Sequence, residues 1–281
     1  SVIAHGQASN SPPVSGRVRG LAVGPGGTRA YMGAANGGVW YTENGGRDWE
    51  PLEDYFMGGG TPTGLAADSL AVGAIAVRFG ATRNDDLVYV GTGEPTGGDA
   101  ALGVGIRRFG PPTGGGPPGW TLEATNLANR GIYRVIIDTE NPERVFAATT
   151  AGFFERPTAG LATWTLRTPT GAAPASAEAT DVALASTGTN RRYYVAYAGG
   201  DVRSFDPGAS TWLTLTGVLG AGNRVCLAAA VKSAAEPNQR VVYALTQTGR
   251  LFRLSPGAGT AFDEVAGMPP VVPQNQGGYD L

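Results

Sequence analysis

Short apolar segments alternate with glycine-rich turns along the whole chain, and no stretch keeps its apolar residues at a helical spacing. When the chain is lined up with itself, five segments share one order of features. Each has an apolar strand, a second strand centred on Tyr or Phe, a glycine turn into a third strand, and a loop that ends in an aromatic residue. The expected first strands are residues 18–23, 72–77, 132–137, 180–184 and 224–231.

The remaining landmarks recur in the same order in each segment. The second strands centre on Tyr31, Tyr89, Phe146, Tyr194 and Tyr243. The third strands begin at Gly38, Gly105, Gly152, Gly200 and Gly249. The closing aromatics are Trp49, Trp120, Trp164, Trp212 and Phe262. A repeat of four short strands predicts an all-β fold of four-stranded antiparallel blades, a β-propeller. The apolar first strands are expected at the innermost position of each blade, buried on both faces.

The repeats predict one domain over residues 1–281. The expected blades are residues 16–54, 69–124, 129–168, 175–217 and 222–267, followed by 268–281 as the start of a further blade or a closing tail. Five complete repeats plus the opening of a sixth first strand favour a piece of a ring of six or more blades. The rest of the polypeptide, or another chain, would complete that ring. A closed five-bladed ring is the alternative.

Composition removes several classes of protein. With 45 Gly and no triplet period the chain is not collagen, and 42% hydrophobic residues are too many for a disordered chain. No apolar run reaches 18 residues, so no membrane insertion is expected. The net charge of −2 and the lack of a basic block exclude a nucleic-acid footprint. The single cysteine, Cys226, lies in an apolar run and is expected to be a buried strand residue.

One hairpin carries a family resemblance. Residues 42–49 closely resemble the Asp-box, or BNR, repeat, a Ser/Thr-x-Asp-x-Gly-x-Thr-Trp turn between the third and fourth strands of propeller blades. Residues 204–212 look like a version stretched by one residue. In an Asp-box the side chains satisfy their own turn and the Trp packs between blades. The resemblance therefore implies a structural role for Thr42, Asn44, Gly46, Asp48, Trp49, Asp206 and Trp212.

More of the chain resembles secreted bacterial proteins related to the sortilin (VPS10) propeller and to xyloglucanase-type glycoside hydrolases. The phrases that carry this resemblance are residues 15–18, 33–40, 69–73, 90–95 and 276–281. The resemblance implies an extracellular or periplasmic location. In this group the closing phrase is normally followed by further blades.

Two long loops fall on the propeller face opposite the Asp-box turns, where loops between blades converge. They are residues 53–68 and 91–103. Long loops in an otherwise economical repeat tend to carry function. The ligand-binding candidates are Asn36, Tyr55, Phe56, Glu94 and Asp99.

Glycoside hydrolysis needs two carboxylates that face each other across the scissile bond. The candidates for these carboxylates are Asp54, Glu94, Asp99 and Asp181. Two comparisons count against hydrolysis. A sialidase would show an Arg-Ile-Pro element, and the nearest match is residues 154–157 in a different context. A xyloglucanase-type enzyme has a catalytic Asp where this chain has Asn36, which cannot act as acid or base.

Other chemistry has little support. The only histidine, His5, has no visible partner. Residues 84–86 gather oxygen ligands of the kind that Ca²⁺ binds, but they are more typical of the turn before the next strand. We expect no cofactor and no metal. The favoured function is a non-catalytic recognition or assembly module for a protein partner or a glycan. The alternatives are a glycoside hydrolase, sialidase-like or xyloglucanase-like, and a purely structural part of a larger extracellular assembly.

Overall fold

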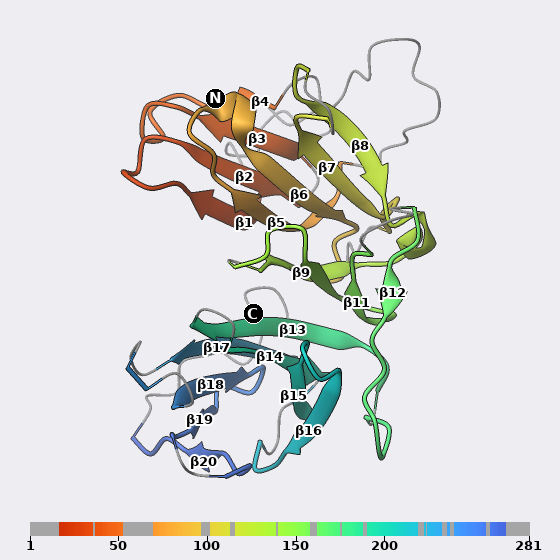
Figure 1. The fold of residues 1–281 in the computed structure, drawn as a ribbon, viewed down its shortest axis with the longest axis vertical. Coiled ribbons are helices and arrows are strands. Elements are labelled where there is room, and N and C mark those ends of the chain that lie inside the picture. The colour runs from red at the N-terminus through yellow and green to blue at the C-terminus, as the bar shows by residue number, and fades with distance from the viewer. Residues whose placement is uncertain are drawn as a thin grey trace, which may run out of the picture.

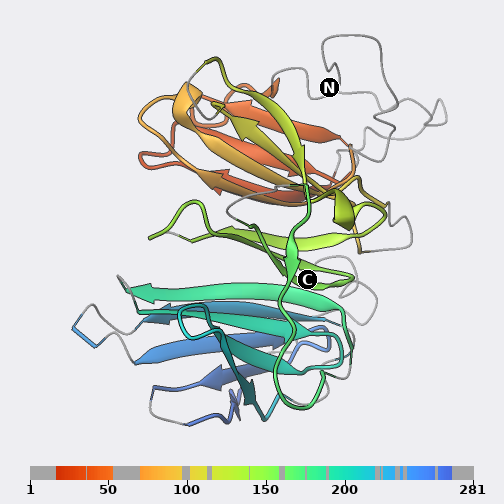
Figure 2. The same cartoon turned by 45° about the vertical axis from the view of Figure 1, so that its right-hand side comes forward.

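The computed structural model describes residues 17–35, 37–52, 70–96, 102–112, 116–138, 140–157, 162–174, 176–187, 190–218, 222, 224–231, 235–236, 239–256 and 259–267. Within these ranges the chain forms five four-stranded sheets, each with its strands paired antiparallel in sequence order. Figure 1 shows the sheets following one another in chain order, with β9 between β5 and β13, and Figure 2 shows the same succession from a second side. The predicted all-β propeller is confirmed, and each sheet is called a blade.

The strand bounds follow the repeat. The first strands are β1 (Val18–Val23), β5 (Val72–Arg78), β9 (Ile132–Ile137), β13 (Ala179–Thr187) and β17 (Val225–Val231). The second are β2 (Ala30–Ala34), β6 (Leu87–Thr92), β10 (Val145–Thr149), β14 (Asn190–Tyr197) and β18 (Arg240–Thr246). The third are β3 (Gly38–Thr42), β7 (Ile106–Gly110), β11 (Gly152–Glu155), β15 (Val202–Asp206) and β19 (Leu251–Leu254). The fourth are β4 (Glu50–Pro51), β8 (Gly119–Glu123), β12 (Thr165–Leu166), β16 (Thr211–Leu215) and β20 (Asp263–Glu264).

A glycine with positive φ leads into the third strand of every blade. The chain must turn sharply there, and positive φ is a conformation that side chains with a Cβ rarely adopt. The five glycines and their φ angles are Gly38 (68°), Gly105 (121°), Gly152 (132°), Gly200 (94°) and Gly249 (82°). The regular spacing of glycine in the sequence therefore reflects one backbone requirement repeated once per blade.

Aromatic side chains fill the space between successive blades. Between blades 3 and 4, the ring of Phe146 lies 4.3 Å from that of Tyr193 and stacks on Phe153 at 5.1 Å, measured between centroids. Phe153 of blade 3 in turn lies 5.9 Å from Trp212, a closing aromatic, and 6.2 Å from Phe205, both of blade 4. Such pairs add to the stability that comes from burying their apolar area. The large side chains in the second and third strands thus hold neighbouring blades together.

Buried aspartates also link neighbouring blades. Asp86, in the loop before β6, accepts hydrogen bonds from the Tyr31 hydroxyl at 2.7 Å and from the Arg29 guanidinium of blade 1 at 3.2 Å. Asp138, which follows β9, accepts corresponding bonds from Tyr193 at 2.6 Å and Arg191 at 3.1 Å of blade 4. Both carboxylates are fully buried, so each needs these donors to offset its lost hydration.

The expectation that first strands are buried on both faces is wrong for β1. Its residues Val18, Leu21 and Val23 are exposed, at 48%, 59% and 56%. The opposite face of β1 packs closely on blade 2, where a Cβ added at Gly20 would lie 2.6 Å from the side chain of Ile75. Only one side of β1 is therefore covered by the residues that the structure describes.

Cys226, expected to be buried, is half-buried. The expected start of a sixth blade, residues 268–281, lies outside the described residues, as does His5. Two single 3₁₀ turns, Arg83–Asp85 and Thr125–Leu127, join strands. In the described ranges no helix is long and apolar enough to span a bilayer.

Candidate functional site

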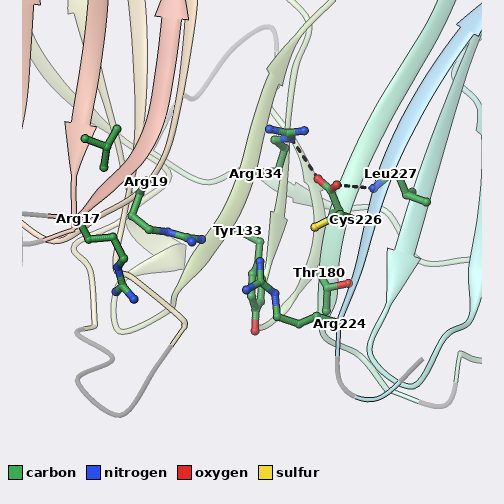
Figure 3. Close-up of a pocket in the computed structure, with 10 residues that line it drawn as sticks. Arg17, Arg19, Tyr133, Arg134, Thr180, Arg224, Cys226 and Leu227 are labelled. Carbon is green, nitrogen blue, oxygen red and sulfur yellow. Dashed lines mark hydrogen bonds and ion pairs between the residues drawn. The ribbon is translucent and has the colours of Figure 1, made fainter. Parts of the chain in front are cut away.

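A pocket of about 310 Å³ opens where the first strands of four blades begin. We call it the central pocket. It is lined by residues 17–19 at the start of β1, Tyr133 and Arg134 of β9, Thr180 and Asp181 of β13, and Arg224, Cys226 and Leu227 at the start of β17. Figure 3 shows these side chains converging from separate blades. The sheet topology places this end of the strands opposite the hairpins that join third to fourth strands.

Two arginines of blade 1 are held by one buried glutamate of blade 2. Glu94, 1% exposed, pairs with Arg17 at 2.5 Å and with the Nε of Arg19 at 3.3 Å. Glu94 also accepts hydrogen bonds from the backbone N–H and the hydroxyl of Thr96. Both oxygens of this carboxylate are therefore engaged with donors, and its charge serves to position the two guanidinium groups.

Asp181 is bound in a similar way in the wall of the pocket. Its Oδ1 accepts hydrogen bonds from Arg134 Nε at 3.1 Å and from the Val182 N–H at 2.8 Å, and its Oδ2 accepts one from the Leu227 N–H at 2.7 Å. Burial raises the pKa of this carboxyl group, while Arg134 and the backbone N–H groups oppose the rise. The surrounding groups are donors, which an ionised carboxylate satisfies best.

Arg224 has no such acceptor. The residue is 8% exposed, and its Nε and Nη1 are buried without a hydrogen-bond partner among the described residues. Its guanidinium lies over the ring of Tyr133, with the carbon 5.1 Å from the ring centroid. The Tyr133 hydroxyl in turn donates to Glu178, and the pKa of Tyr133 is raised, chiefly by burial. Figure 3 shows Arg224 beside Tyr133 and Thr180.

The pocket therefore holds an excess of positive charge. Among the described residues, Arg17, Arg19, Arg134 and Arg224 supply four positive charges, and Glu94, Asp181 and the Glu178 that binds Tyr133 supply three negative ones, which leaves an excess of one. Burial lowers the pKa of Arg19, and the nearby Arg224 and Arg17 lower it further, although Glu94 opposes them. The arrangement can bind an anion, because several guanidinium groups share a small, partly dry space.

The structure brings two of the predicted site residues to this end of the propeller. Asp181 lines the pocket, and Glu94 holds two of its arginines. The other candidates, Asn36, Asp54, Tyr55, Phe56 and Asp99, lie outside the described residues. The four pocket arginines were not predicted from the sequence. Arg19 and Arg134 interrupt first strands that were expected to be innermost, and a charge at such a position is a signal that could have found them.

The segment that resembles an Asp-box makes its hydrogen bonds within its own turn. Asn44 Oδ1 accepts from the N–H groups of Arg47 at 3.0 Å and Asp48 at 3.1 Å, and its Nδ2 donates to Asp48 at 2.9 Å. Thr42 Oγ1 accepts from the Gly46 N–H at 3.1 Å. Trp49, partly buried, precedes β4. In blade 4, Asp206 accepts from the N–H groups of Gly208 and Ala209, in the turn that precedes Trp212.

Two other candidate elements have structural partners. Arg156, in the segment nearest to a sialidase Arg-Ile-Pro element, pairs with the buried Glu123 of blade 2 at 3.0 Å and with Glu143. In the 84–86 turn, Asp85 accepts from Thr82 and Asp86 binds blade 1 as described above. The described residues contain no group of three or more His, Cys, Asp and Glu side chains placed to hold a metal ion.

No protein-family model matches the chain, and no curated protein matches it. Among solved structures, it is similar to an ancestral GH74 enzyme, with 19% identity and a TM-score of 0.58 over 84% of this chain and 30% of that one. This likeness shows the fold alone. A GH74 enzyme of Niastella koreensis gives 17% identity and a TM-score of 0.57 over 89% and 37%. YCF48 from Cyanidioschyzon merolae gives 15% and 0.54 over 90% and 73%. The chain thus spans about a third of the two GH74 enzymes.

Proposed function

We propose that this chain is a non-catalytic recognition propeller, extracellular or periplasmic, that binds a protein partner or a glycan at its central pocket. One observation carries the proposal. Both described carboxylate candidates, Glu94 and Asp181, have each oxygen occupied by arginine, hydroxyl or backbone donors. Neither presents a free O–H or a free oxygen to a substrate, while the guanidinium groups they position face the pocket.

The shape of the site supports binding. The pocket volume, about 310 Å³, is at the lower end of the range of small-ligand sites, so it suits one group of a larger partner. Its walls come from the starts of the first strands of four blades, and the ion pairs of Arg17 and Arg19 with Glu94 and of Arg134 with Asp181 favour guanidinium groups that are in place before a ligand arrives. The extracellular or periplasmic location rests on the resemblance to secreted bacterial propellers.

The test combines binding with turnover. Native affinity electrophoresis against a panel of neutral and acidic polysaccharides measures retention of the protein, and reducing-end analysis of the same samples measures cleavage. We expect retention without new reducing ends. Because Cys226 is the chain's only cysteine and lines the pocket, capping it with methyl methanethiosulfonate should reduce the retention. New reducing ends that rise in proportion to protein concentration would contradict the proposal.

Glycoside hydrolysis is the second candidate, since two of the similar structures are GH74 enzymes and burial raises the pKa of Asp181. A raised pKa is typical of a general acid. The sequence counts against a xyloglucanase-type mechanism, because Asn36 stands where that group has its catalytic Asp. If the panel does show cleavage, loss of that cleavage in both Asp181→Asn and Glu94→Gln would assign it to these two residues.

A further inference from the structure

We infer that the central pocket is an oxyanion site, and that its ligand is a carboxylate or sulfate ester carried by an acidic polysaccharide. This inference rests on the proposed function and names the chemistry that the same pocket would recognise. It starts from Arg224, whose buried guanidinium lacks an acceptor among the described residues.

The state of Arg224 differs from that of its neighbours. Arg17 and Arg19 have Glu94 as ion-pair partner, and Arg134 has Asp181. Among the described residues Arg224 has no ion pair of its own: it lies on the face of Tyr133 and interacts with Asp181 only at longer range. A buried charge without a counter-charge is costly, and so are buried donors without acceptors. An oxyanion in the pocket supplies both the negative charge and the acceptor oxygens next to this guanidinium.

The surroundings select a small anion of fixed geometry. Guanidinium groups bind carboxylate, sulfate and phosphate oxygens through paired N–H donors, which a halide or a neutral hydroxyl cannot match. The excess of one positive charge described above remains after Glu94, Asp181 and Glu178 have been counted. A singly charged anion, such as a carboxylate or a sulfate ester, neutralises that excess without leaving any of these carboxylates unpaired.

The polar character of the lining favours a glycan over a protein. Protein partners are usually held by large apolar or aromatic anchors in well-packed pockets. Here the wall contains four arginines, the half-buried Cys226 and only two apolar side chains, Val18 and Leu227, and the one aromatic face, that of Tyr133, is covered by Arg224. Sugar hydroxyls beside the anionic group find hydrogen-bonding partners in such a wall, whereas a leucine or a phenylalanine does not.

The single cysteine reports the charge of the pocket directly in the unmodified protein. Two methanethiosulfonates of similar size, the anionic sulfonatoethyl and the cationic trimethylammonioethyl reagent, are reacted with Cys226 at fixed ionic strength. The ratio of anionic to cationic rate is compared with the ratio in the urea-unfolded chain. We expect the native ratio to be about tenfold higher, because the excess positive charge attracts one reagent and repels the other. An unchanged ratio overturns the oxyanion site.

Protection of Cys226 then identifies the ligand. Oligogalacturonate carries carboxylates, a sulfated oligosaccharide carries sulfate esters, and a neutral oligosaccharide of equal length carries neither. Slowing of the reaction by one or both acidic oligosaccharides, but not by the neutral one, supports the inference and tells carboxylate from sulfate. Equal protection by the neutral sugar overturns the anion assignment and leaves the proposed function standing. Protection by sodium sulfate alone, or by polyglutamate alone, overturns the assignment to a glycan.

Matched variants locate the effect. In Arg224→Gln the rate ratio should fall severalfold and protection by the acidic oligosaccharide should weaken at least tenfold. Arg224→Lys should retain most of the rate ratio but lose most of the protection, because an ammonium keeps the charge and not the paired donors. The control Arg47→Gln, in the hairpin at the other end of blade 1, should change neither. Equal protection in Arg224→Gln and in the unmodified protein contradicts the inference.

Discussion

Replacing Asp86 by Ala should destabilise the contact between blades 1 and 2 by more than the loss of a single hydrogen bond would. Three donors lose their acceptor: the Tyr31 hydroxyl at 2.7 Å, the Arg29 guanidinium at 3.2 Å and the Gly80 N–H at 2.7 Å. Tyr31 is 1% exposed, so water cannot replace the lost bond. Buried donors without acceptors cost about 1–3 kcal/mol each, and breaking a buried ion pair costs about 3–5 kcal/mol. We expect a loss of about 4 kcal/mol.

The assay is thermal unfolding followed by circular dichroism. A loss of that size should lower Tm by about 10 °C in a chain of this length. Tyr31→Phe removes one of the three bonds and should cost about 1 kcal/mol. The control is Tyr41→Phe, which removes an exposed hydrogen bond of 2.9 Å to Glu50 and should cost less than about 0.5 kcal/mol. Equal losses in Tyr31→Phe and Tyr41→Phe would refute the reasoning, because burial would then not decide the cost.

Gly73→Ala should destabilise the fold by roughly 2–3 kcal/mol or more in urea titrations, because the added Cβ would lie 2.1 Å from the carbonyl oxygen of Ile132 in the next blade. The control Gly119→Ala, where the added Cβ meets open space, should leave stability nearly unchanged. Burial and a buried carboxylate raise the pKa of Tyr193, so its phenol should stay protonated when unfolded tyrosines ionise near pH 10. Above pH 10 the native state then binds more protons than the unfolded state, so stability should fall as the pH rises through 10. Tyr193→Phe should lessen this fall. It should leave the absorbance titration of the native protein at 295 nm unchanged below pH 11. Burial also raises the pKa of the Cys226 thiol, so native iodoacetamide modification at pH 8 should be at least about tenfold slower than in urea, and equal rates would contradict this.

The repeat and the four-stranded antiparallel sheet that each repeat forms could be predicted from the sequence because they depend on local requirements. Each blade needs a residue with positive φ at the entrance to its third strand, and each repeat has a glycine there, such as Gly38 or Gly152. Each blade also closes with a large aromatic such as Trp164, which is 1% exposed. Such features can be recognised in the local sequence, without knowledge of contacts between distant segments.

The central pocket could not be predicted because it is made by contacts between distant segments. Arg17 and Arg224 lie more than 200 residues apart in the sequence and meet only once four blades have been arranged in space. Asp181 was expected as a weak catalytic candidate, but its partner Arg134 comes from the neighbouring blade. The exposure of Leu21 in β1 has the same origin, because burial of a first strand depends on which blade lies beside it.

The most direct test of the account is calorimetric titration of the unmodified protein with oligogalacturonate and with a sulfated oligosaccharide, followed by chain-length analysis of the recovered ligand. The account predicts that at least one of the two binds with one ligand group per central pocket, that Arg224→Gln weakens this binding at least tenfold, and that the sugar is recovered at its original length. Recovery of shortened chains, or affinity that does not change in Arg224→Gln, would contradict a recognition site built around these arginines.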